Sequence, residues 1–355
     1  MTKEGLLAFW LHISVPRYKT IIALFGSLDN FWQTQKSDLQ KLKWPKETLD
    51  KFIVWRDSLD EQKCENDLKK ANARIITIVD PDYPPLLAAI FDPPYTLFVQ
   101  GQLKNNQPLL AVVGTRQNTF VGKQIIEKIV EPFAKEIGIV SGLAYGIDSF
   151  AHQAALNVNA YTIAVLGAGF DSNELFAERK KISEQIIASG GAVITEYPPG
   201  TASTNYTFPK RNRIISGLAK ATLVIEAGIK SGALITASCA LEQGREVLAV
   251  PHSIFSLVGV GPNNLIKDGA TIITSVNDLR AVFNLNQKKK SQSTVPISSN
   301  PIENIIMAFL ANEPQTGDAI VQKLNLPAHH VAVLLTEMEI KGMIQAILGN
   351  RYICS

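Results

Sequence analysis

The sequence predicts an α/β protein with a mainly parallel sheet at its core, a helical segment before the core and a winged-helix-like unit after it. Short β-type runs such as LLAVV, YTIAVL and ATLVIEA alternate with helix-like segments of roughly ten residues or more. Several of these runs are apolar throughout, as strands buried on both faces should be. Near the C-terminal end, three helical patterns precede a hairpin pattern, which is the order of a winged helix-turn-helix.

Length and charge limit the possible functions. A chain of 355 residues is too long for one typical domain, and two or three are expected. The formal net charge is only +3, so any binding of nucleic acid must come from a local basic patch. The first residues lack a signal-peptide pattern, and no apolar run approaches the ~20 residues that cross a bilayer. We therefore expect a cytoplasmic protein that does not insert into a membrane.

The first domain, residues 1–68, is expected to be small and helical. The stretches EGLLAFWLHI and RYKTIIALFG carry apolar residues three and four positions apart. Gly26 is placed like a residue that ends a helix, and Trp44-Pro45 interrupts the next helical pattern.

The core is predicted to span residues 69–285. It opens on the β-branched run ARIITIVD, continues through a proline-rich connection and then alternates strands with helices. The clearest helix is VGKQIIEKIVEPFAKEIG, where Glu131 and Lys135 are spaced for an i,i+4 ion pair. Its apolar stripe consists of Ile125, Ile126, Ile129, Val130, Phe133 and Ile137.

Residues 286–301 are predicted to be a linker and residues 302–355 the winged-helix-like domain. The linker is polar, and its lysines at 288–290 are interpreted as solvated. In the last domain, Thr316 is a candidate helix cap, Pro327 lies near a helix start, and Gly349-Asn350 suggests the turn of a hairpin. Its third helix is poor in base-reading side chains, which favours protein contact or self-association over duplex recognition.

The turns that follow the predicted strands are rich in glycine and other small residues. Ligands of open α/β sheets bind beyond the carboxyl ends of the strands, and small residues let the backbone approach a phosphate at a helix start. The predicted phosphate-accepting turns contain Gly114, Thr115, Ser141, Gly142, Gly167, Ser231 and Gly232.

Cations gather at the same predicted edge. Arg116 lies in the first turn, and the stretch TFPKRNRIISGL supplies Lys210, Arg211 and Arg213. Arginine suits phosphate oxygens, and Phe208 could stack on a base whatever its identity, so this combination favours a single-stranded nucleic-acid groove. One alternative is left open for Arg213, which could pair internally with Glu196 or Glu226. Asn212 is expected to tie its loop to the backbone.

Patterns for cofactors, metals and catalysis are incomplete. The motif around Gly167 and Gly169 has Ser172 in place of the third glycine of a dinucleotide site, and the first turn does not fit a P-loop. The cysteines lack metal-ligand spacing, and Asp148 with His152 lacks a third ligand. We therefore expect no cofactor, no metal and no catalytic residues.

Five ordered stretches resemble one known family, DNA-processing protein A, also called DprA or Smf. They are AVVGTRQNTFVG, IVSGLAYGIDSFAHQAAL, TIAVLGAGFD, FPKRNRIISGLAKATLVIEAGIKSGALITASCALEQGREVLAVP and GPNNLIKDGA. The resemblance implies an extended Rossmann-like core, an N-terminal helical domain of SAM or helix-hairpin-helix type and a C-terminal winged-helix-like domain. His252 departs from the family glycine at its position, and Phe176-Ala177 stands near the position of a family Tyr-Pro pair.

The resemblance also implies a function. Members of the family bind single-stranded DNA, load the RecA recombinase onto it during natural transformation, relieve inhibition by single-strand-binding protein and form homodimers. By motif position, Arg116, Lys210, Arg211 and Arg213 correspond to the DNA contacts of the family.

Two other readings remain open at this point. The chain could be a phosphoribohydrolase-like enzyme acting on a nucleotide phosphate, with Glu226 or Glu242 as the carboxylate to suspect. Alternatively, it could be a scaffold whose winged helix recruits partners while the core only dimerises.

Overall fold

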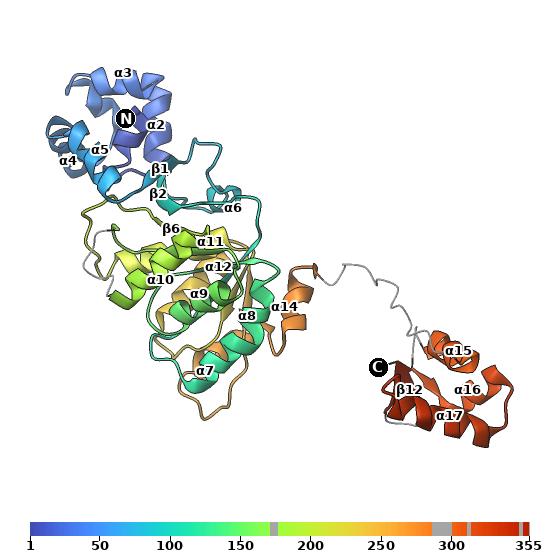
Figure 1. Cartoon of the computed structure of the whole chain (residues 1–355). Helices are drawn as coiled ribbons and strands as arrows, with labels where there is room; N and C mark the ends of the chain where they lie inside the picture. The colour runs from blue at the N-terminus through green and yellow to red at the C-terminus, as the bar shows by residue number, and fades with distance from the viewer. Residues whose placement is uncertain (171–176, 286–299, 311–313, 348–350, 355) are drawn as a thin grey trace. The chain divides into compact units, whose positions relative to one another are not determined.

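The computed structural model describes residues 1–170, 177–285, 300–310, 314–347 and 351–354 (Figure 1). They form two compact units, Met1–Phe283 and Asn284–Ser355, which are considered separately. Within these ranges, none of the helices has the length and apolar character that crossing a membrane requires. Most of the expected linker lies outside the described residues, as do the turn at Gly349-Asn350, Ser172 and Phe176.

The first unit begins with a bundle of short helices. They are α1 (Lys3–Leu7), α2 (Val15–Phe25), α3 (Leu28–Gln33), the 3-10 turn η1 (Asp38–Leu42), α4 (Lys46–Asp57) and α5 (Glu61–Lys70). Side-chain oxygens of Ser14 and Ser27 accept hydrogen bonds from backbone amides at the starts of α2 and α3. Gly26 ends α2 with φ +78°, which confirms the predicted helix end.

The helical bundle and the sheet share buried side chains. Phe31 and Phe52 are fully buried in the helical cluster, and Tyr95, which immediately precedes a sheet strand, packs into the same cluster. Helix α5 continues to Lys70, two residues past the predicted boundary. The boundary at residue 68 thus stays a prediction, because Met1–Phe283 is one compact unit.

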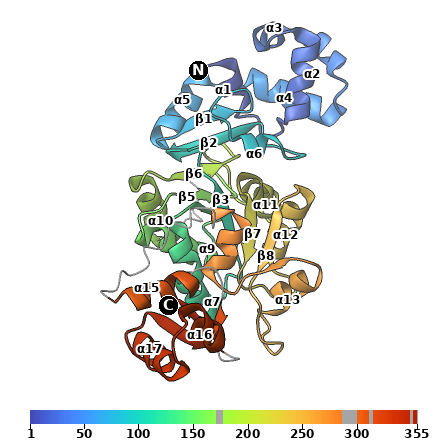
Figure 2. The ribbon, with the colours of Figure 1, turned by 90° about the vertical axis from the view of Figure 1, so that its right-hand side faces the viewer.

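A nine-stranded sheet forms the centre of the unit (Figure 2). Its strands are β1 (Arg74–Thr77), β2 (Thr96–Gly101), β3 (Leu109–Val113), β4 (Gly138–Ser141), β5 (Thr162–Val165), β6 (Ala192–Thr195), β7 (Ala221–Val224), β8 (Glu246–Ala249) and β9 (Thr271–Ile272). Their order is β1-β2-β6-β5-β4-β3-β7-β8-β9, with antiparallel pairing only at β1, β2 and β6. The seven strands from β3 onward pair in parallel, which confirms the predicted core.

Helices cover both faces of the sheet. They are α6 (Pro85–Ala88), α7 (Phe120–Ile125), α8 (Glu131–Ala134), α9 (Ile147–Asn157), α10 (Ala177–Ala188), α11 (Thr207–Leu218), α12 (Gly232–Glu242), α13 (Val260–Lys267) and α14 (Val276–Val282). On β5, Ile163 and Val165 join the cluster beneath α11 and α12, whereas Ala164 joins the cluster beneath α10. Alternate residues therefore serve opposite faces, as the pleat of a strand requires.

The helix predicted from VGKQIIEKIVEPFAKEIG is interrupted by one wider turn. A π-turn, η2 (Ile126–Val130), joins α7 to α8. Pro132 has no N–H to donate to the preceding turn, which accounts for the interruption. The predicted apolar stripe is confirmed, since all its members are buried except the half-buried Ile125. Glu131 accepts a hydrogen bond from the Asn157 side chain at 2.9 Å.

The second unit has the helices and hairpin of the predicted winged-helix pattern. Its elements are α15 (Pro301–Leu310), β10 (Gln315–Thr316), α16 (Gly317–Leu324), α17 (Ala328–Ile340), β11 (Ile344–Ile347) and β12 (Arg351–Cys354). The strands pair antiparallel in the order β10-β12-β11. Thr316 caps α16 by accepting from the Ala319 amide at 3.2 Å, as the sequence predicts.

Candidate nucleic-acid interface

A pocket of about 530 Å³ lies where the strand order of the sheet reverses. From β3 the chain adds β4, β5 and β6 in turn on one side, and then returns to add β7, β8 and β9 on the other side. Open α/β sheets bind ligands at such a point. The polar lining residues are Thr115, Arg116, Gln117, Asp148, Arg211, Asn212, Lys230, Ser231 and Thr236.

The turn after β3 is tightly packed. A Cβ atom at Gly114 would lie 2.5 Å from Ile147, so only glycine fits there. The Thr115 amide donates to the backbone oxygen of Glu226 at 2.7 Å, and the Thr115 oxygen accepts from the Ile147 amide at 3.3 Å. These contacts fix the turn between α9 and β7, and the next residue, Arg116, is left exposed at the pocket.

Arg116 lies over the ring of Phe208. Its guanidinium carbon is 5.3 Å from the ring centroid, which is within the range of a cation–π contact. Beneath the ring, a Cβ atom at Gly167 would come within 2.9 Å of Phe208. Gly167 thus provides the space in which Phe208 lies, with Arg116 on the solvent side.

Arg211 lies at the floor of the pocket and is only 5% exposed. Its Nη1 donates to the oxygens of Gly142, at 2.7 Å, and Val165, and its Nε donates to Asn212. Burial lowers the pKa of Arg211 to about 10, against the raising effect of Asp148, so the group stays charged at neutral pH. The buried guanidinium differs from the expected free phosphate clamp, because its hydrogen bonds hold the ends of two strands.

The start of α12 also lines the pocket. Ser231 caps the helix by accepting from the Ala233 amide at 3.3 Å. The Asn212 side chain donates to the Gly232 oxygen at 3.2 Å, which confirms that Asn212 ties its segment to the backbone. A Cβ atom at Gly232 would meet open space, so the helix N-terminus, with its positive end, faces the pocket unobstructed.

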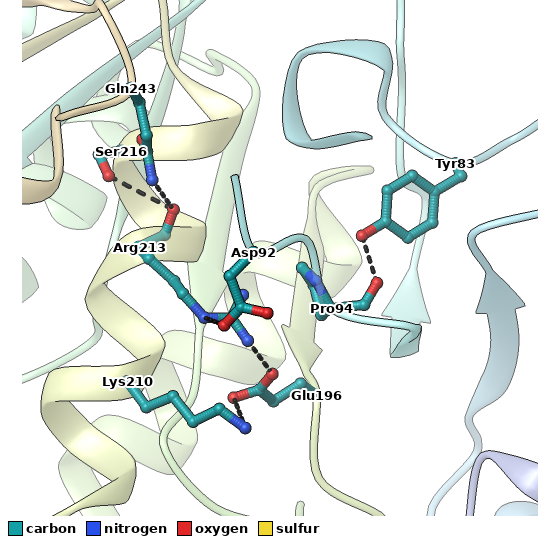
Figure 3. Close-up of polar contacts among 8 residues, drawn as sticks. All are labelled: Tyr83, Asp92, Pro94, Glu196, Lys210, Arg213, Ser216 and Gln243. Carbon is teal, nitrogen blue, oxygen red and sulfur yellow. Dashed lines mark hydrogen bonds and ion pairs between the residues drawn. The ribbon is translucent and has the colours of Figure 1, made fainter. Parts of the chain in front are cut away.

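Lys210 and Arg213 lie on a different face of α11 from Arg211. Figure 3 shows both pointing to Glu196, which bonds Arg213 and lies 3.6 Å from the Lys210 ammonium. Asp92 lies 3.4 Å from Arg213 on its other side. Arg213 and Glu196 are buried to about nine-tenths, whereas the Lys210 side chain is 49% exposed. The internal pairing of Arg213 with Glu196, one of the two alternatives, is confirmed.

The predicted residues therefore divide into two sets. Gly114, Thr115, Arg116, Phe208, Arg211, Ser231 and Gly232 line the pocket. Ser141, Gly142 and Gly167 lie behind the lining. There Ser141 donates to the Val112 oxygen at 2.6 Å, and the Gly142 amide donates to Asp148 at 3.2 Å. A direct phosphate contact from these three residues stays a prediction.

Two residues beside the site were not singled out from the sequence. Lys230 lines the pocket and is exposed just before the cap of α12. The sequence could have indicated Lys230, because it directly precedes the small-residue turn Ser231-Gly232. Tyr206, at the start of α11, is 85% exposed. The sequence could have indicated it as a second aromatic ring, two residues before Phe208.

The suspected carboxylates are not arranged for catalysis at this pocket. Glu226 is fully buried and accepts from the Thr119 amide at 2.9 Å and from the Thr119 hydroxyl, which fixes the segment before α7. Glu242 is exposed near the end of α12 and is not among the lining residues. Within the part of the chain that the structure describes, no group of acidic, cysteine or histidine side chains could hold a metal ion.

Comparison with known proteins identifies relatives of both units. The family model for DNA recombination-mediator protein A matches residues 74–284, and the DprA winged helix domain matches residues 290–350. Protein Smf of Escherichia coli (strain K12) is 36% identical over 320 residues, covering 87% of this chain and 82% of the relative. DNA processing protein DprA of Streptococcus pneumoniae is 41% identical over 208 residues, covering 58% of this chain and 73% of the relative.

Two solved structures of DNA processing proteins are also similar to this chain. The X-ray structure of DNA processing protein A from Streptococcus pneumoniae has a TM-score of 0.68 and 32% identity, covering 79% of this chain and 98% of that one. DNA processing protein A from Helicobacter pylori, described with a single-stranded DNA binding mode, has a TM-score of 0.54 and 25% identity. That match covers 61% of this chain and 98% of the other.

Proposed function

Because the chain belongs to the DNA recombination-mediator protein A family, also named DprA or Smf, we propose that it binds single-stranded DNA and loads the RecA recombinase onto it. The observation that carries this proposal is the pocket at the strand-order reversal, where Arg116 lies over Phe208 beside Lys230 and an open helix N-terminus. A relative from Helicobacter pylori is described as binding single-stranded DNA.

Different groups of the pocket contact the phosphates and the bases of the strand. Arg116 and Lys230 are exposed cations that can reach phosphate oxygens, and the start of α12 adds the N-terminal end of its helix dipole. When Arg116 turns toward a phosphate, it uncovers Phe208, whose ring can then stack a base of any identity. Arg211 contributes positive charge from the floor while it holds the strand ends beneath.

Lys210 has a place at the margin of this site. It is half-exposed, and its distance of 3.6 Å from Glu196 is longer than a normal hydrogen bond. Such a pair contributes little stability, so the ammonium can exchange Glu196 for a phosphate. Arg213 keeps Glu196 and acts by holding α11 in place.

The proposed activity is binding rather than catalysis, with no cofactor or metal. Glu226 and Glu242, the carboxylates suspected for a phosphoribohydrolase, have a structural role and an exposed position away from the pocket. Further proposals follow from the family: a cytoplasmic location, a homodimer, and displacement of single-strand-binding protein during natural transformation.

The proposal is tested in two steps on the intact chain. Fluorescent oligonucleotides of several sequences should bind with similar affinity when single-stranded and much more weakly as duplexes. The chain should then accelerate assembly of RecA on DNA covered by single-strand-binding protein. Preference for duplex would contradict the binding proposal, and unchanged RecA assembly would contradict the loading role. Release of free base from nucleoside monophosphates would revive the enzymatic alternative.

A further inference from the structure

A second combination of aromatic rings and cations lies in the N-terminal helical bundle. A hollow of about 490 Å³ is lined by Trp44 together with Lys36, Lys46 and Asp50. Trp44 stacks on Trp10 with ring centroids 5.2 Å apart, so one face of the indole is held while the residue remains partly exposed. An indole at the wall of a lysine-lined hollow has the composition of a single-strand binding surface.

Two further cations of the same bundle, Arg17 and Lys51, lie outside the lining of this hollow. Arg17 lies 5.8 Å from the ring centroids of both Trp10 and Trp44, and it donates to the His12 oxygen. Lys51 is exposed on the neighbouring face of α4, where it pairs with Glu47 at 2.6 Å. An exposed ion pair of this kind contributes little to stability, so Lys51 can exchange Glu47 for a phosphate.

Lys210, at the margin of the core pocket, has an electrostatic effect on the N-terminal bundle. Burial, and then the charges of Lys51, Arg17 and Lys210, lower the pKa of His12, whereas Glu47 works weakly in the opposite sense. Lys210 therefore acts electrostatically on the N-terminal bundle from the helix that carries Phe208.

We propose that a strand longer than the core pocket continues past Lys210 onto the N-terminal bundle, where Trp44 stacks a base and Lys46 and Lys51 bind phosphates. This inference rests on the proposed binding of single-stranded DNA by the core. The occupant is the same strand, because the surface repeats the pairing of cations with an aromatic ring that is found at Arg116 and Phe208.

Tryptophan fluorescence offers a direct test. The chain has four tryptophans, Trp10, Trp32, Trp44 and Trp55, and all of them pack in the N-terminal bundle. The intact chain is titrated with labelled oligothymidylates of increasing length, and label anisotropy and tryptophan emission are followed together. Short oligonucleotides should bind without changing the emission. Longer ones should bind several-fold more tightly and quench it.

A double variant locates the effect. Lys46→Gln with Lys51→Gln should abolish the gain in affinity with length and most of the quenching, while leaving short oligonucleotides unaffected. For long oligonucleotides, the salt slope should fall by roughly 1.4, because each lysine that neutralises a phosphate of a single strand adds about 0.7 to it. The matched control is Lys63→Gln with Lys69→Gln, which removes the same charge from α5 of the same bundle.

The possible outcomes separate this inference from the proposed function. Unchanged emission at saturation with long oligonucleotides, or equal behaviour of the two double variants, would overturn the extension onto the bundle while leaving core binding intact. If no oligonucleotide of any length binds, the proposed function itself fails.

Discussion

At the residue scale, burial separates side chains that look alike in the sequence. Lys210, Arg211 and Arg213 form one basic motif, yet their environments differ. Arg211 is buried among carbonyl oxygens, Arg213 pairs with Glu196, and Lys210 is half-exposed. The basic motif predicted that cations lie near the site. The partners of each cation could not be predicted, because they are residues far away in the sequence.

Replacement of Arg211 should first reduce stability. Arg211→Ala removes the charge that faces the buried Asp148 and leaves the Gly142 and Val165 oxygens without their donor. Each buried acceptor left without a donor costs about 1–3 kcal/mol, so the urea midpoint of unfolding should fall markedly. Lys210→Ala is the control and should change the free energy of unfolding by less than about 0.5 kcal/mol. Equal midpoints for the two variants would refute the structural role of Arg211.

His152 should make the stability of the core sensitive to acid. It is fully buried with Nδ1 2.8 Å from the Thr162 hydroxyl, and burial followed by the charge of Arg211 lowers its pKa to about 3. The unfolded chain binds the proton with a pKa near 6.5. The stabilisation from neutral His152 is thus complete above about pH 6.5 and is lost as the pH falls toward 3.

The measurement compares the free energy of unfolding of wild type and His152→Gln between pH 7 and 3. Burial raises the pKa of the neighbouring Asp148, which favours the folded state on acidification and opposes the effect of His152. The difference between the two proteins isolates the histidine, and the variant should lose less stability per pH unit. Identical slopes would rule out this contribution.

At the scale of elements, the helical period explains how the basic motif divides. Helix α11 begins at Thr207, so Phe208 and Arg211, three residues apart, share the face toward the pocket. Lys210 and Arg213 share another face by the same spacing, toward Glu196. This division could have been predicted by extending the helix through the motif. The π-turn before Pro132 was less predictable, because proline also occurs at simple helix ends.

The turn after β5 should control the site without contributing charge. Gly167→Ala would bring a Cβ atom within 2.9 Å of Phe208 and so displace the ring beneath Arg116. We expect a several-fold loss of affinity for single-stranded DNA with an unchanged salt slope, since no cation is removed. Anisotropy titrations at several salt concentrations measure both quantities. A variant that folds and binds like wild type would show that the position of the ring does not matter.

At the scale of the whole molecule, the architecture was largely predictable and the contacts between segments were not. Alternating β and helical patterns predicted the parallel core and the winged-helix unit, because the apolar period of each segment indicates which of its own side chains are buried. The antiparallel addition of β1 and β2 beside β6 depends on pairing across about a hundred residues, for example of Gly101 with Ala192. The proline-rich segment between β1 and β2 concealed this pairing.

The division into two units predicts where DNA binding lies. A fragment comprising Met1–Phe283 contains all the lining residues of the pocket and forms one compact unit. It should bind single-stranded oligonucleotides with an affinity within a few-fold of the whole chain. A folded fragment that retains no DNA would instead assign binding to the C-terminal unit or to its cooperation with the core.

The salt dependence of binding to the intact chain tests the central claim most directly. Arg116→Ala is compared with wild type and with Arg74→Ala, which removes another exposed arginine, at the start of β1. If the pocket at the strand-order reversal holds phosphates, Arg116→Ala should weaken binding about tenfold for every sequence and lower the salt slope by about 0.7. Arg74→Ala should bind like wild type. An Arg116→Ala variant with unchanged affinity and salt slope would contradict the assignment of this pocket to single-stranded DNA.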